Sequence, residues 1–110
     1  MAYRIEISDE ADAELNAAYL FLSQRSPEAA FRWFKGAKKI INSLSLFPRR
    51  CPIARENAGY SNHEVRQLIY GAGLSAYRVL FIIFEEDQEI RVMQFRRGAR
   101  HTGSPETEDK

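Results

Sequence analysis

The chain begins with a short alternating pattern and continues at helical spacing. Tyr3–Ile7 alternates apolar and charged residues, which predicts a β-strand with its apolar side chains on one face. Ser8 follows as a candidate N-cap, and the next turn is acidic, as the helix dipole favours. Apolar residues then recur every three or four positions, which predicts a first helix over about Asp9–Gln24.

A second helix is predicted to begin almost at once. Ser26 is a good cap, and Pro27 stands at the first helical position, where its missing N–H costs nothing. The apolar stripe of this helix extends to Leu44, and Pro48 ends the segment. Because only a turn around Arg25 and Ser26 separates the two helices, they are predicted to form an antiparallel hairpin.

Several large apolar residues lie outside these two helical stripes. They are Tyr19, Phe21, Phe31, Trp33 and Ile40. One interpretation is a broad interface between the helices and a sheet. The other is a hydrophobic groove that receives a helix or strand of a partner protein.

The second half of the chain has strand patterning. Val65–Tyr70, Ala76–Glu85 and Glu89–Arg96 are predicted strands, and turn residues separate them. Ala76–Glu85 is almost continuously apolar, which predicts a central strand that is buried on both faces. Phe47–His63 contains prolines, a glycine and scattered charge, so it is predicted to be a long loop.

The predicted element order is therefore β-α-α-β-β-β, which is an α+β fold. Residues 1–101 are expected to form a single domain. Residues 102–110 are polar and contain Gly and Pro, so they are expected to be a flexible tail.

Composition narrows the class of protein. A chain of 110 residues can bury a core without a metal or a disulfide, and Cys51 is its only cysteine, which fits a reducing compartment. The net charge of +1 argues against strong sequence-independent binding to nucleic acid. We see neither a signal-peptide pattern nor an apolar run long enough to cross a bilayer, so we expect a cytoplasmic protein without membrane association.

The most informative charge pattern lies in Val65–His101, which holds six arginines and no lysine. Arginine offers a planar, permanently charged fork that suits phosphate or carboxylate. Arg78 alternates with apolar residues of the central strand. One interpretation is that its guanidinium group reaches solvent or an internal carboxylate while its aliphatic stem packs. The other is that the strand holds this cation rigidly for a functional role. Arg66 is expected to lie near Arg78 if their strands pair as a hairpin.

Standard catalytic motifs do not occur in the sequence. It has no Gly-rich phosphate loop, no paired-cysteine metal site and no HExxH, so no metal or cofactor is expected. His63 and His101 are the only histidines, and histidine is a residue type that can serve as an acid or base. The more ordinary interpretation is that both are surface residues.

Five segments, taken in order, resemble the RelE/ParE family of toxins from bacterial type II toxin–antitoxin modules. They are SPEAAFRWF in the helix pair, LSLFP at its end, VRQL at Arg66, AYRVLF at Arg78 and IRVMQFRRGAR near the C-terminus. The resemblance covers about Tyr3–His101. It implies an N-terminal helical hairpin packed on a curved, mainly antiparallel sheet, in which the last three strands form a meander.

The resemblance also implies a partner and two groups of contact residues. The partner is a small cognate antitoxin with a DNA-binding N-terminus, whose tail wraps the toxin in a hetero-oligomer. The apolar groove would then be the antitoxin site. The candidate contact residues for the target or for an acidic antitoxin tail are Arg66, Arg78, Arg96, Arg97 and Arg100.

The family divides by mechanism. VRQL, GAR and the long hairpin resemble ParE-like members, which poison DNA gyrase without established nuclease chemistry, so inhibition of gyrase is our first expectation. The alternative is ribosome-dependent mRNA cleavage of the RelE type, and another is a non-toxic binding module of the same fold. For a nuclease, the catalytic residues would come from Arg66, Arg78, Arg97, Arg100 and His101.

Overall fold

The structure, a computed structural model, describes residues 2–59, 63–71 and 76–98. Its helices and strands are β1 (Arg4–Ile7), α1 (Asp9–Ser23), α2 (Pro27–Asn42), β2 (Val65–Tyr70), β3 (Tyr77–Phe84) and β4 (Glu89–Arg97). The predicted order β-α-α-β-β-β and the α+β class are confirmed. The predicted tail at residues 102–110 lies outside the described residues.

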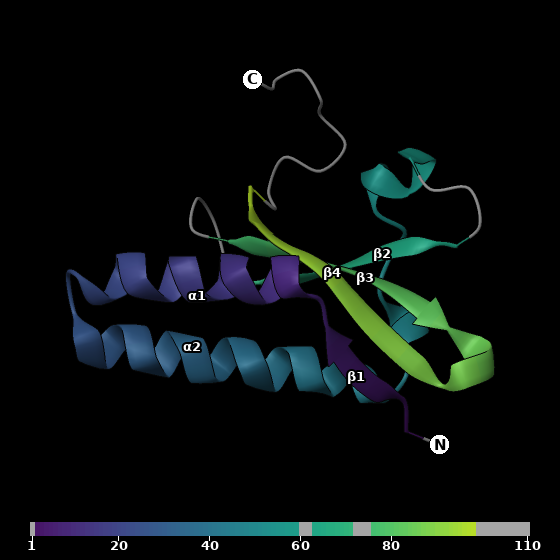
Figure 1. Ribbon diagram of the computed structural model, residues 1–110, viewed down its shortest axis with the longest axis horizontal. Coiled ribbons are helices and arrows are strands. Elements are labelled where there is room, and N and C mark those ends of the chain that lie inside the picture. The colour runs from purple at the N-terminus through teal and green to yellow at the C-terminus, as the bar shows by residue number, and fades with distance from the viewer. Residues whose placement is uncertain (1, 60–62, 72–75, 99–110) are drawn as a thin grey trace.

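The strands form one mixed sheet in the order β1-β4-β3-β2. β2 pairs antiparallel with β3, and β3 pairs antiparallel with β4, which gives the meander that the family resemblance implied. β1 pairs parallel with β4 at the edge of the sheet. Figure 1 shows the two helices lying side by side, with the turn that joins them at the end of the hairpin away from β1.

Both helices begin where the sequence predicts. The Ser8 hydroxyl accepts the Ala11 N–H at 3.0 Å and caps α1. Ser26 accepts the Ala29 N–H at 3.3 Å and caps α2, which has Pro27 in its first turn. These caps satisfy N–H groups that a helix cannot pair internally, so they set the start of each helix.

Strand β3 is buried on both faces, as predicted. Val79 and Phe81 belong to the main core, together with Leu15 of α1 and Ile41 of α2. Leu80 and its neighbours on the opposite face form a second buried cluster. Its buried members are Ala54, Val65, Leu80 and Ile82. The helices therefore cover one face of the sheet, and residues of the long loop help to cover the other.

The long loop between α2 and β2 is more ordered than its composition suggests. Short 3₁₀ turns interrupt it at η1 (Ser43–Ser45), η2 (Pro48–Arg50) and η3 (Arg55–Gly59). Ile53 forms an isolated antiparallel bridge with Arg66 of β2. The loop therefore runs along the outer edge of the sheet before it returns to the second cluster.

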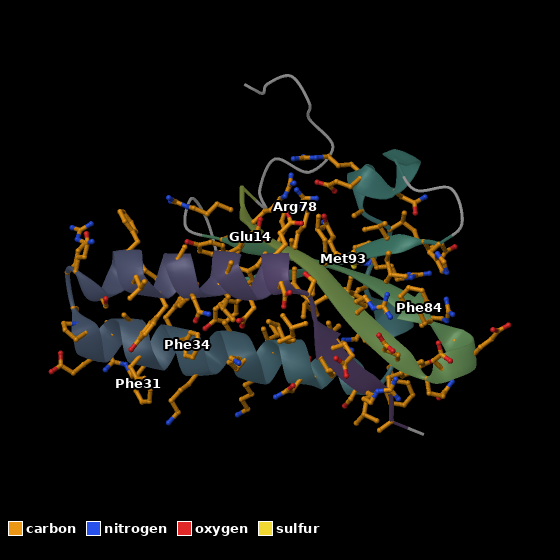
Figure 2. All side chains as sticks on the ribbon, in the orientation of Figure 1. Glu14, Phe31, Phe34, Arg78, Phe84 and Met93 are labelled. Atoms are coloured by element: carbon orange, nitrogen blue, oxygen red, sulfur yellow. The ribbon has the colours of Figure 1, made fainter. Side chains whose placement is uncertain are left out.

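A β-bulge in β4 is stabilised by helix α1. Leu80 lies opposite Gln94 and Phe81 lies opposite Val92, so Met93 is the extra residue. A Glu14 carboxylate oxygen accepts the Phe95 N–H at 2.7 Å, and the Ser8 hydroxyl donates to the Met93 carbonyl at 2.9 Å (Figure 2). Two side chains of the α1 region thereby satisfy backbone groups at the bulge.

Among the described residues, we find no helix with the length and apolar character that a membrane crossing requires.

We predict that Glu14→Ala lowers the free energy of unfolding by about 1–3 kcal/mol, because a part-buried backbone N–H loses its acceptor. Glu10→Ala is the matched control on the same helix, since Glu10 makes only an exposed hydrogen bond to Gln94. It should cost about 0.5 kcal/mol or less. Urea unfolding of both variants measures the difference, and equal losses would contradict a special role for Glu14.

Candidate functional site

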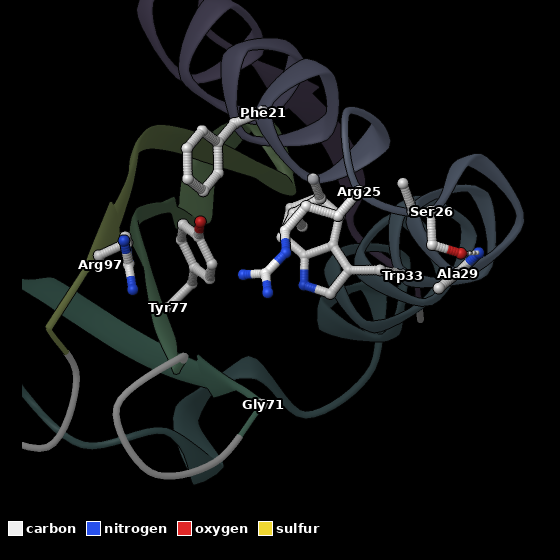
Figure 3. Close-up of a pocket in the computed structure, with 10 residues that line it drawn as sticks. Phe21, Arg25, Ser26, Ala29, Trp33, Gly71, Tyr77 and Arg97 are labelled. Atoms are coloured by element: carbon white, nitrogen blue, oxygen red, sulfur yellow. Dashed lines mark hydrogen bonds between the residues drawn. The ribbon is translucent and has the colours of Figure 1, made fainter.

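A pocket of about 410 Å³ lies where the helical hairpin meets one end of the sheet. Its walls come from α1, α2 and the ends of three strands or their neighbouring turns. The lining residues are Phe21, Leu22, Arg25, Ser26, Ala29, Ala30, Trp33, Gly71, Tyr77 and Arg97. Figure 3 shows the aromatic and arginine side chains around it. We call it the hairpin pocket.

Trp33 and Tyr77 form an aromatic floor of the hairpin pocket, and Tyr70 and Phe95 pack beside Trp33. The Trp33 ring centre lies 5.4 Å from that of Tyr77 and 5.9 Å from those of Tyr70 and Phe95. The Tyr70 hydroxyl donates to the Trp33 carbonyl at 2.7 Å. This approach needs Gly36, since a Cβ there would collide with the hydroxyl. The floor is thus fixed by packing and by a hydrogen bond to the helix backbone.

The hairpin pocket combines an apolar interior with positive charge. Arg25 lines it from the turn between the two helices, and Arg97 lines it from the end of β4. Both side chains are exposed. Guanidinium groups bind carboxylates well, and apolar walls bind aliphatic or aromatic side chains. The pocket therefore suits a peptide segment in which an apolar residue lies close to an acidic one.

The five apolar residues outside the helical stripes divide between the two interpretations. Trp33 packs on the sheet and also lines the hairpin pocket, whereas Phe21 lines the pocket with 56% of its surface exposed. Tyr19 packs against Phe34 with ring centres 4.8 Å apart, and Ile40 is half-buried. Phe31 is 51% exposed and lies outside the pocket.

Arg78 is buried inside the protein, with only 1% of its surface exposed. Its Nε donates to the Gln67 side-chain oxygen at 3.1 Å, and its Nη2 donates to the Glu56 carboxylate. Of the interpretations from the sequence, the internal carboxylate is the one observed. Figure 2 shows Arg78 on the sheet at the side that the η3 turn approaches.

The ion pair changes the acidity of Glu56. Burial alone would raise the pKa of its carboxyl, but the hydrogen bond from Arg78 and further favourable interactions outweigh burial. The net pKa of Glu56 is therefore below its usual range, and the pair stays ionised near neutral pH. A buried arginine that lost this partner would leave an uncompensated charge.

The expectation that Arg66 lies near Arg78 is wrong. Arg66 pairs with Phe81, which is three residues from Arg78 along β3, so the two arginine side chains lie on opposite faces of the sheet. Arg66 donates to the Cys51 carbonyl at 2.6 Å and to Glu64 at 2.9 Å. It is held by the long loop and by the residue that comes just before its strand.

The remaining arginines also separate. Arg96 lies opposite Arg78 and Arg97 lies opposite Tyr77, so these neighbours on β4 belong to different faces. Arg97 thereby reaches the hairpin pocket, and Arg96 does not line it. Arg100 and His101 lie outside the described residues. The described arginines therefore do not all lie on one face of the sheet.

His63 shares a small cavity with two arginines. The cavity measures about 220 Å³ and is lined by Arg49, His63, Glu64, Arg66 and Ile83. The centre of the His63 ring lies 4.6 Å from the ring centre of Phe84.

Within residues 2–59, 63–71 and 76–98, we find no group of three or more His, Cys, Asp or Glu side chains that could hold a metal ion.

Sequence reasoning did not single out Arg25 or Glu56 as partners in these sites. Arg25 sits in a turn. Glu56 is a lone acid in a loop. Only the three-dimensional contacts identify them, since each belongs to a site built from segments distant in the chain.

We predict that the Glu56 carboxylate makes stability sensitive to acid. Because its folded-state pKa is lowered, its contribution is complete above its ordinary pKa of 4.5 and is lost as pH falls through the folded value. Glu56→Gln should be less stable at pH 7 and should lose less stability between pH 5 and pH 3 than the unsubstituted protein. Denaturant unfolding at several pH values measures both effects.

Glu86→Gln is the matched control for this prediction, because Glu86 is an exposed carboxyl. It should keep the acid sensitivity of the unsubstituted protein. If Glu56→Gln showed the same pH profile as this control, the Arg78–Glu56 pair would not contribute as described.

Comparison with known proteins gives one family and one fold. The family described as "ParE toxin of type II toxin-antitoxin system, parDE" matches residues 5–102. A solved structure entitled "Chromosomal ParDE TA system from P. aeruginosa" has a similar fold, with a TM-score of 0.65 and 18% sequence identity. The match covers 87% of this chain and 96% of that chain. No curated protein sequence matches.

The family match extends from β1 to the end of the sheet, and the solved structure supports the same arrangement of elements. This confirms the resemblance to the RelE/ParE family drawn from the sequence, and the expectation that the chain resembles the ParE-like members more closely. Because the family is described as the toxin of a toxin–antitoxin system, its members have an antitoxin as partner. The chain belongs to the ParE toxin family of type II toxin–antitoxin systems.

Proposed function

We propose that this toxin acts in the cytoplasm, where it arrests growth by inhibiting DNA gyrase, and that a cognate antitoxin neutralises it. The observation that carries the proposal is the burial of Arg78 against Glu56. The arginine that would serve a nuclease best is thereby engaged inside the fold. What remains at the surface suits protein–protein contact.

The chemistry of RNA cleavage makes this observation informative. Cleavage needs a cation close to the scissile phosphate and a group that takes the proton of the 2′-hydroxyl. Arg78 is covered and already neutralised, and Arg66 lies on the other face of the sheet. A toxin directed against gyrase needs a complementary surface and no acid–base pair, which fits this arrangement better.

Ribosome-dependent mRNA cleavage is the second candidate function. It is favoured by the small cavity in which His63 lies with Arg49 and Arg66. An imidazole and two guanidinium groups are suitable for proton transfer and phosphate binding. Glu64, however, already pairs with Arg66 at 2.9 Å and lies 3.9 Å from Arg49, which reduces the positive charge available there.

The hairpin pocket is our candidate antitoxin site. Its aromatic floor and its arginines match a tail that alternates apolar and acidic residues. Such a tail can add a buried apolar anchor to charge-assisted hydrogen bonds, which together give affinity and register. This narrows the groove suggested by the sequence to the part that contains Phe21 and Trp33.

Induced expression without the antitoxin tests the proposed target. We predict that growth stops, that plasmids lose negative supercoiling and that transcripts stay intact. The measurements are growth curves, plasmid topoisomer gels and mapping of mRNA ends. Codon-biased cuts in translated mRNA with normal plasmid topology would favour the second candidate. Unimpaired growth would instead indicate a non-toxic binding module.

We further predict that Phe21→Ala weakens antitoxin binding by about tenfold or more, the usual cost of truncating an interface aromatic. Phe31→Ala is the matched control, because Phe31 is similarly exposed on the same hairpin but lies outside the pocket. The measurement is titration of each toxin variant with the small protein encoded beside it. If the two variants bound the antitoxin with equal affinity, the hairpin pocket would not be part of the antitoxin-binding site.

A further inference from the structure

Leu46 and Phe47 form an exposed apolar pair just after the η1 turn. Leu46 is 53% exposed and Phe47 is 80% exposed. Phe47 also has a φ of +52°, in the left-handed region that costs a residue with a Cβ. An aromatic residue that is both exposed and strained lowers the stability of the fold. Strain of this kind concentrates at functional sites, so Phe47 needs an explanation.

The strained backbone at Phe47 is held by Arg50. One guanidinium nitrogen of Arg50 donates to the Leu46 carbonyl at 2.8 Å and to the Phe47 carbonyl at 3.1 Å. The other donates to the Ser43 hydroxyl at 3.0 Å. Pro48, which follows, is buried and begins the η2 turn. The segment therefore presents the Phe47 ring from a fixed backbone.

A further cavity, of about 630 Å³, lies beside this pair. We call this region the Phe47 surface. Its lining residues are Tyr3, Leu46, Phe47, Pro48, Arg49, Arg50, Glu85 and Gln88. Arg49 is paired with Glu85 at 3.0 Å, whereas the three hydrogen bonds from the Arg50 guanidinium go to neutral acceptors. The lining residues therefore carry one excess positive charge, which a partner carboxylate would complement.

The charges next to the Phe47 surface select the class of partner. Glu85 lines the surface, and Glu86 and Asp87 follow it in the exposed η5 turn (Glu85–Asp87). Glu85 is paired with Arg49, so Glu86 and Asp87 are the acids of this turn that repel an extended array of phosphates, such as a lipid bilayer or nucleic acid. A single partner carboxylate placed beside Arg50 avoids that repulsion. A partner protein with an apolar pocket could bind the Phe47 ring, and a single carboxylate at the rim of that pocket could pair with Arg50.

The Phe47 surface is also distinct from the candidate antitoxin site. Leu46 and Phe47 follow the C-terminal end of α2, whereas residues of the first turns of α2 line the hairpin pocket. An antitoxin tail in the hairpin pocket and a partner at the Phe47 surface would therefore use opposite ends of this helix.

We propose that Leu46 and Phe47 are a hydrophobic anchor by which the toxin docks into an apolar, carboxylate-rimmed pocket of its protein target. The inference rests on the proposed function, because it takes the target to be a protein such as gyrase. Aromatic residues with an adjacent arginine are typical of the residues that dominate binding energy at interfaces. The fixed backbone reduces the entropy lost when Phe47 is docked.

Phe47→Gly separates an anchor from a structural feature. Glycine relieves the left-handed strain, so the melting temperature should rise by a few degrees. Removal of the ring should at the same time reduce growth arrest on induction, and reduce inhibition of purified gyrase by about tenfold or more. Phe31→Ala, which removes another exposed phenylalanine, should leave growth arrest unchanged.

The alternatives give different results. Full growth arrest by Phe47→Gly would overturn the anchor. If the substitution instead turned a dimer of the toxin into monomers in light scattering, a second copy would cover the surface and the proposal would fail. Phe47-dependent binding to vesicles of phosphatidylserine and phosphatidylcholine would overturn it in favour of a membrane. If growth arrest needed Phe47 while the unsubstituted toxin left gyrase unaffected, only the choice of gyrase would fail.

Discussion

Strand β3 has to be covered on both faces, and the arrangement of the other elements depends on that requirement. Its six N-terminal residues are buried, and each large apolar side chain among them is stabilised by about 1.5–3 kcal/mol when it leaves water. The helical hairpin covers Val79 and Phe81, and the long loop helps to cover Leu80 on the other face. The loop is fastened by the pair between Arg78 and Glu56, so a charge that looks functional in the sequence has a structural partner.

Because Arg78 is engaged inside the fold, the proposed contacts with partner proteins involve exposed residues. One end of the hairpin forms a pocket in which Trp33 supplies an aromatic floor and Arg25 and Arg97 supply positive charge. At the other end of α2, Arg50 holds Phe47 in an exposed, strained conformation. We propose that one protein neutralises this toxin and that another is its target, and these two surfaces would serve one contact each. Their separation along α2 allows the two contacts to be tuned independently.

Much of the fold could be predicted because its signals are local. The Ser8 and Ser26 caps, the limits of β2 and the double burial of β3 all follow from residues that are near one another in the chain. The site could not be predicted in the same way. The opposite faces of Arg66 and Arg78 depend on strand register, which turn geometry and packing decide. The parallel pairing of β1 with β4 and the left-handed backbone of Phe47 are likewise set by distant contacts.

We propose that this ParE-family toxin acts by contact with a protein target and performs no nuclease chemistry. The most direct measurement adds the purified toxin to purified gyrase with relaxed plasmid and, separately, to ribosomes translating a defined mRNA. We expect supercoiling to fall as the toxin approaches the concentration of gyrase, while the mRNA stays whole. Cleavage of the mRNA with supercoiling unaffected would show instead that the toxin is a nuclease.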